Sequence, residues 1–209
     1  MKKIALTLLM GIIGMNTFAQ DANTPPKKAT KKKTPIVRPI HCPAIYISTS
    51  TGINNSTGLL GFSIDVPVDK NISIEGGPGI SSWGYKVYIG AKYYLQPCQR
   101  GWAFGTGLTY NTGIQGYQRN METVTGYSEN VQLNLNPQTN ILFAAYKYWN
   151  LGKRYNRFYM ELGWSVPLSG GNKFDQTLGD PIDDRSTKTM NFIAPGGLIA
   201  AVGFSFGVH

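Results

Sequence analysis

The chain has 209 residues, the length of one ordinary domain, and only 15% of them are charged, against about 25% in a typical soluble domain. Beyond the N-terminus no apolar run approaches the ~20 residues that a membrane helix needs, which excludes a mature helical membrane protein. Large β-forming side chains recur throughout residues 44–209, which argues against intrinsic disorder there. The net charge of +9 invites a nucleic-acid interpretation, which depends on where the charge lies.

Residues 1–19 are predicted to be a secretory signal peptide. Lys2 and Lys3 form a basic start, residues 4–15 are apolar, and Thr17 and Ala19 place small side chains at −3 and −1 of a cut after Ala19. No cysteine stands near this position, so a lipoprotein anchor is not indicated.

Residues 20–43 are rich in proline and lysine, and we expect a flexible tail because so few apolar groups cannot offset the entropy of ordering. Signal and tail hold most of the excess positive charge, because residues 44–209 carry 12 basic and 10 acidic side chains. We therefore expect no nucleic-acid partner. The tail is either a solvated spacer or a segment attracted to an anionic surface, such as lipid headgroups or cell-wall polymer.

From residue 44 onward the apolar residues recur with a period of two, which is typical of β-strands. In residues 197–209, for example, Leu198, Val202 and Phe204 share one face, and Gly203 and Ser205 share the other. The stretch 129–149 keeps one phase throughout, so it is predicted as a single strand despite its internal proline. The eight predicted strands are 44–51, 58–66, 71–81, 84–95, 101–115, 129–149, 156–168 and 190–208.

The links between these strands alternate in length, and the two longest, 116–128 and 169–189, fall at the same end. An even number of strands with short turns at one end and long loops at the other is typical of outer-membrane barrels. The sequence therefore predicts an all-β fold, an eight-stranded antiparallel up-and-down transmembrane barrel over residues 44–209. A soluble lipocalin-like barrel would also alternate, but it would show water a face rich in charged side chains.

The less apolar face is mainly glycine, alanine, serine and asparagine, as expected of the narrow interior of an eight-stranded barrel. Its few charges are nearly balanced, and isolated charges would be costly there, so we expect a mutually satisfied network in which Glu75 and Lys92 pair directly. The predicted interior charges are Asp65, Glu75, Lys86, Lys92, Arg157 and Glu161. Tryptophans near strand ends are predicted to mark the membrane interfaces, namely Trp83, Trp102, Trp149 and Trp164.

In this architecture residues 44–209 resemble the small outer-membrane β-barrel family of Gram-negative bacteria, the eight-stranded OmpA/OmpX-like type. The signal ending at Phe18, Ala19 and Gln20 resembles that of Bacteroidetes-type exported proteins. The closing residues 203–209 resemble the aromatic-alternating final strand that barrel-assembly machinery recognises, although this chain ends in His209. The resemblance is one of pattern and implies no catalytic motif.

Chemistry-bearing residues are few. Cys42 and Cys98 both lie at the predicted short-turn end, in an oxidising compartment, and are candidates for a disulfide that would pin the tail under the lumen. The two histidines, His41 and His209, have no serine–acid partner, and no metal-ligand spacing is present. We expect no catalytic residue, no metal and no cofactor.

The sequence thus favours a non-enzymatic outer-membrane barrel with an occluded lumen and a structural or interaction role. That role would be envelope integrity, adhesion, or membership of an envelope complex, with membrane lipid and other envelope proteins as partners. The long loops would face outside, and the tail and short turns would face the periplasm. The alternatives are a porin-like narrow-pore transporter, a lipid-modifying outer-membrane enzyme and a soluble periplasmic lipocalin-like binder.

Overall fold

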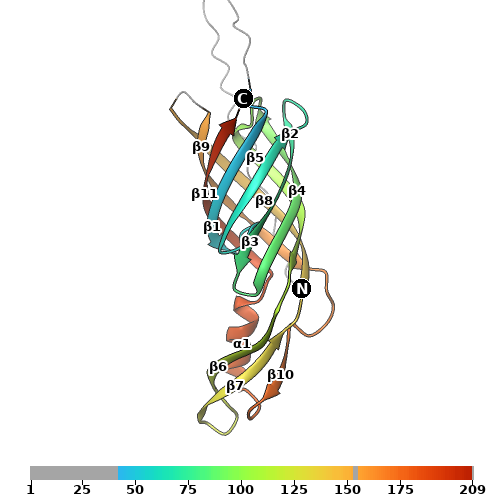
Figure 1. The fold of residues 1–209 in the computed structure, drawn as a ribbon, viewed down its shortest axis with the longest axis vertical. Helices are drawn as coiled ribbons and strands as arrows, with labels where there is room; N and C mark the ends of the chain where they lie inside the picture. Colours follow the sequence, from blue (N-terminus) through green and yellow to red (C-terminus); the bar gives the residue numbers. More distant parts are fainter. Residues whose placement is uncertain (1–41, 153–154, 209) are drawn as a thin grey trace, which may run out of the picture. The chain divides into compact units, whose positions relative to one another are not determined.

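The computed structural model describes residues 42–152 and 155–208. The predicted signal peptide, all of the predicted tail except its last two residues, and both histidines lie outside these ranges. The described residues form two antiparallel β-sheets and one helix, and the larger sheet is a closed barrel (Figure 1).

Eight antiparallel strands form the barrel, in which each strand pairs with the next barrel strand along the chain and the first pairs with the last to close the sheet. The predicted fold class, an eight-stranded antiparallel up-and-down barrel, is confirmed. The barrel strands are β1 (Ile45–Ile53), β2 (Leu60–Pro67), β3 (Ile72–Ser81), β4 (Gly84–Gln96), β5 (Arg100–Asn111), β8 (Gln138–Leu151), β9 (Asn156–Pro167) and β11 (Gly197–Val208).

The two faces of the barrel differ in chemistry as the alternation predicts. Large apolar side chains point outward on every barrel strand and are widely exposed: Phe62 is 61% exposed and Ile89 is 62% exposed. Inward positions hold buried serines, tyrosines and charged groups. An exterior that is apolar and an interior that is polar invert the arrangement of a soluble barrel.

The second sheet consists of β6 (Ile114–Glu122), β7 (Ser128–Leu135) and β10 (Phe174–Leu178), in the order β10-β7-β6. Helix α1 (Asp184–Ile193) follows β10, and these elements lie beyond the end of the barrel that holds the β3–β4 turn (Figure 1). We call them the extension. The predicted loops 116–128 and 169–189 are therefore largely ordered secondary structure.

The prediction of one long strand over 129–149 is wrong. The segment is divided at Asn136 and Pro137: β7 belongs to the extension and β8 to the barrel. Pro137 has no N–H for a sheet ladder, and the N–H of Asn136 donates to the carbonyl of Lys173 instead. The continuous apolar phase arises because Leu133 and its neighbours are buried in the extension, whereas Phe143 faces outward from the barrel.

Two other predicted strand limits are corrected. The strand predicted over 101–115 ends at Asn111, because Gly113 adopts a positive φ of 75° and turns the chain into β6. The strand predicted over 190–208 begins at Gly197, because residues 190–193 complete helix α1.

The extension has its own apolar core, and Trp83 from the β3–β4 turn joins that core to the barrel. Trp83 is fully buried and its indole Nε1 donates to the carbonyl of Asn136 at 3.0 Å. Ser82 Oγ donates to the carbonyl of Ile193 at 3.0 Å, and the N–H of Gly113 donates to the Trp83 carbonyl at 3.1 Å. The core residues are Trp83, Met121, Val131, Leu133, Leu135, Met190 and Ala194.

Candidate functional site

The interior of the barrel is the candidate site, because all six predicted interior charges lie there. Each is at most 3% exposed, and the described residues contain no other buried charged side chain. Three are acidic and three basic, so their formal charges cancel. The structure distributes them into three groups along the barrel.

Arg157 on β9 and Asp65 on β2 form the group nearest the short-turn end. Arg157 Nη2 lies 3.6 Å from Oδ2 of Asp65 and donates to Ser205 Oγ at 3.1 Å, while Nη1 donates to the Gln99 carbonyl. The guanidinium also stacks 3.5 Å from the centre of the Tyr46 ring. These contacts place the cation between a carboxylate and an aromatic face, which offsets its desolvation.

Glu75 on β3 and Lys92 on β4 form the second group. Lys92 Nζ lies 2.5 Å from Glu75 Oε2 and donates to the Tyr148 hydroxyl at 3.0 Å. Ser63 Oγ donates to Glu75 Oε1 at 2.7 Å, and the Tyr146 ring centre lies 4.1 Å from Lys92 Nζ. Both partners of this ion pair therefore have additional hydrogen bonds, as a buried pair requires.

Glu161 and Lys86 form the third group, and both contact the loop between β1 and β2. Ser56 Oγ of that loop donates to Glu161 Oε2 at 3.2 Å, and Lys86 Nζ donates to the Asn55 carbonyl at 2.6 Å. Asn55, Ser56 and Thr57 are all at most 4% exposed, so the loop folds into the barrel. It occupies the end of the lumen beside the extension.

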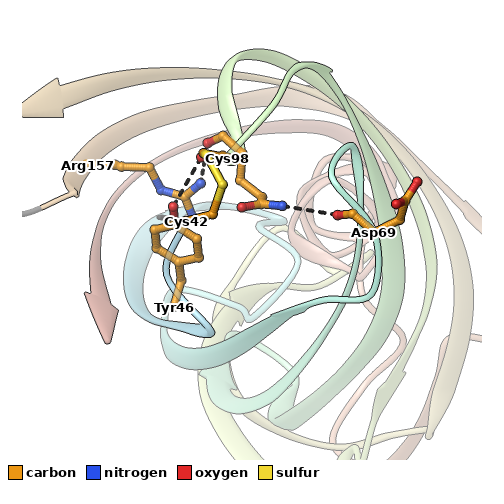
Figure 2. The surroundings of a disulfide bond; sticks show 6 residues. Cys42, Tyr46, Asp69, Cys98 and Arg157 are labelled. Carbon is orange, nitrogen blue, oxygen red and sulfur yellow. Dashed lines mark hydrogen bonds between the residues drawn. A yellow bond between two sulfur atoms is a disulfide. The ribbon is translucent and has the colours of Figure 1, made fainter. Parts of the chain in front are cut away.

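A disulfide between Cys42 and Cys98 closes the opposite end (Figure 2). Cys42 precedes β1, where the N–H of Ala44 donates to the carbonyl of Val208, and Cys98 lies in the β4–β5 turn. The turn reaches across the barrel mouth to β1 and β9, and the two cysteine Cα atoms are 5.0 Å apart. Tyr46 Oη donates to the Cys98 carbonyl at 3.1 Å. Cys98 and Gln99 are at most 2% exposed, so this turn covers Arg157.

Inward tyrosines are an interior feature that the predicted set of charges does not include. Tyr94 Oη donates to Asp65 Oδ2 at 2.6 Å, and Tyr146 Oη donates to Glu161 Oε1 at 3.2 Å. Their positions follow the inward phase of β4 and β8, so strand phase would have found them. The buried interior tyrosines are Tyr46, Tyr88, Tyr94, Tyr146, Tyr148 and Tyr159.

Three of the four predicted interface tryptophans lie on the outside of the barrel. Trp102, Trp149 and Trp164 are 42–56% exposed, and the Lys147 ammonium lies 5.0 Å from the Trp102 ring centre. Trp83 is a correction: it is buried in the extension core and does not face outward, because the turn that carries it docks on β7.

The acidic loop before α1 has a structural role. Asp183 is the N-cap of the helix, and its Oδ1 accepts a 2.7 Å hydrogen bond from the N–H of Ser186. Hydrogen bonds from the backbone and side chain of Ser186 hold the pKa of the Asp183 carboxyl below its ordinary value. Within residues 42–152 and 155–208, no group of three or more histidine, cysteine or acidic side chains could hold a metal ion.

No helix in the described part of the chain has the length and apolarity to cross a membrane.

No protein-family model and no curated protein matches this sequence. Among solved structures, the fold is similar to the N-terminal β-barrel domain of OprF from Pseudomonas aeruginosa. The two chains share 13% identity with a TM-score of 0.42, over 78% of this chain and 95% of that one.

Proposed function

We propose that the chain is an integral outer-membrane barrel with an occluded lumen and a structural or interaction role. The observation that carries this proposal is the continuous apolar exterior of all eight barrel strands. Apolar side chains exposed over so large an area would promote aggregation in water, and they match the outward band of a membrane barrel.

The proposed orientation places the extension outside the cell, with the short turns and the basic tail in the periplasm. Long loops of such barrels face outside and short turns face the periplasm, and the extension carries the two longest connections. The tail residues, including Lys31, Lys32 and Lys33, would meet anionic polymer or headgroups there.

The interior favours a barrel with a blocked lumen and argues against a pore. The β1–β2 loop enters one end, the Cys42–Cys98 disulfide covers the other, and charged and tyrosine side chains lie between them. An eight-stranded barrel is just wide enough for side chains to fill. The extension, which has its own core, is then the part suited to contact other envelope components.

Fractionation tests the membrane assignment. The full chain should float with vesicles in a density gradient, resist extraction by alkaline carbonate and require detergent for solubility. Recovery of folded protein from the soluble fraction without detergent would contradict the proposal and favour a lipocalin-like binder.

Planar-bilayer recording tests the occluded lumen. The reconstituted barrel should pass no ion current above that of the bilayer alone. Four interior charges form ion pairs, Glu161 and Lys86 are hydrogen-bonded to the inserted loop, and both ends are covered. A reproducible current that Glu161→Gln alters would instead support a narrow pore.

A further inference from the structure

A groove of about 460 Å³ lies on the outside of the barrel, where the rim at its extension end meets helix α1. Its floor is formed by the outward side chains of Ile53, Trp164 and Leu198, at the extension ends of β1, β9 and β11. Phe192, near the end of α1, forms a wall. The volume is in the range of small-ligand sites.

The floor continues the apolar exterior of the barrel. Trp164 on β9 pairs with Leu198 on β11, and they are 56% and 59% exposed. Phe192 is 79% exposed on a helix of which only Met190 is buried. Contact with an alkyl chain would remove this exposed ring from water and lower the free energy. An alkyl chain that lies on the apolar floor is within reach of such a contact.

The lining of the groove also carries a positive charge. Lys173 and Asn191 line the groove, and no aspartate or glutamate does. The ion pairs of the described residues join Lys92 to Glu75 and Arg157 to Asp65, so neither engages Lys173. The carboxylates of Asp183 and Asp184 line a neighbouring hollow with Lys188 instead. An apolar floor together with one cation in the lining matches an acylated molecule with an anionic headgroup.

We propose that this groove binds the phosphorylated, acylated glycolipid of the outer leaflet. One acyl chain would lie over Trp164 and Leu198 beneath Phe192, and a phosphate would accept hydrogen bonds from the Lys173 ammonium. The inference rests on the proposed function, because the extension end meets the outer leaflet only in the proposed orientation. We choose this glycolipid over a glycerophospholipid because the groove would lie in the outer leaflet.

Native mass spectrometry of the full chain in detergent tests the site with three probes. They are diphosphorylated lipid A, the same lipid A after enzymatic removal of its phosphates, and phosphatidylglycerol. We expect the phosphorylated lipid A to be retained about fivefold better than the dephosphorylated form, the effect of one lysine near an anionic surface.

Two variants separate the parts of the site. Lys173→Gln should reduce the phosphate preference to near one, and Phe192→Ala should lower retention of both lipid A forms without changing their ratio. Lys188→Gln is the control for charge, because Lys188 lies on α1 with Phe192 but does not line the groove. Tyr127→Ala is the control for the aromatic ring, because Tyr127 is an exposed residue of the β6–β7 turn. Both controls should behave as the wild type.

The inference is overturned if Lys173→Gln keeps the wild-type ratio, or if phosphatidylglycerol is retained as well as phosphorylated lipid A. Vesicle flotation of the same preparations distinguishes this failure from that of the proposed function. A chain that floats but shows no phosphate preference refutes the lipid site alone. A chain that does not float refutes the membrane assignment.

Discussion

The Nζ atom of Lys92 lies 2.5 Å from Oε2 of Glu75, and both side chains are at most 3% exposed. Neither residue faces the other directly in the β3–β4 register, where Lys92 is opposite Ser73 and Glu75 is opposite Gly90. The pair is therefore diagonal across two strands, and its geometry depends on the inward phase of both.

Removal of one partner of this pair should be more harmful than removal of both. Lys92→Met leaves Glu75 as an uncompensated buried charge and should lower the free energy of unfolding by about 3–5 kcal/mol. The double variant Lys92→Met with Glu75→Gln should recover much of that loss. Urea unfolding in detergent measures both, with Lys70→Met in an exposed turn as the control. Equal destabilisation by the single and double variants would contradict this account.

The disulfide should stabilise the barrel without determining its fold. It spans 56 residues, and its loss in the double variant Cys42→Ser with Cys98→Ser should cost about 4 kcal/mol in the chain-entropy account. The variant should still form the barrel, because β1 closes the sheet through its pairing with β11. Denaturant midpoints with and without reductant provide the measurement. An unchanged wild-type midpoint on full reduction would refute a stabilising bond.

Gly79 should tolerate no side chain. A Cβ at this position would lie 2.9 Å from the carbonyl oxygen of Leu60 and still closer to that of Thr57, both of them backbone atoms. Gly79→Ala should therefore prevent folding or displace the β1–β2 loop from the lumen. Gly170→Ala is the matched control, because nothing lies within 4 Å of its Cβ position. The yield of the folded, heat-modifiable form on a gel reports both. A normal yield for Gly79→Ala would show that the loop is not closely packed.

Helix α1 should fray in acid. The pKa of Asp183 is lowered in the folded protein by hydrogen bonds from Ser186, so its stabilising effect is present above the ordinary aspartate pKa. That effect is lost as the pH falls through the lowered value. Amide exchange of residues 184–193 should accelerate over this acidic range while the barrel stays protected. In Asp183→Asn, which keeps a capping oxygen without a titrating group, the acceleration should be absent.

Trp83 should determine whether the extension is ordered. Trp83→Ala removes the largest buried side chain of the extension core and should cost this part about 3–5 kcal/mol. Limited proteolysis should then cut within residues 114–136 or 173–196, whereas the barrel strands stay intact. Trp164→Ala removes an outward tryptophan and should leave the extension resistant. Resistance of Trp83→Ala would show that the barrel junction does not depend on this residue.

The sequence by itself determined the barrel, because a period of two in eight stretches assigns each residue to one of two faces whatever the tertiary details. It placed Asp65, Glu75, Lys86, Lys92, Arg157 and Glu161 on the inward face, where the structure has them. Tyr146 and Tyr148 keep the inward phase of β8, but residue type alone is as compatible with a membrane interface as with an interior. The tyrosines that hydrogen-bond to the interior charges were therefore not singled out.

Only the tertiary structure decided where strands leave the barrel. Val131 and Phe143 share one alternating phase, yet one is buried in the extension and the other faces outward. Alternation indicates that one face of a strand is apolar, but it does not predict what covers that face. The core around Trp83 could therefore not be predicted from it. Periodicity along one strand does not encode contacts between distant segments. It therefore does not predict the insertion of Asn55 into the lumen, the reach of the β4–β5 turn to Cys42, or the groove beside Phe192.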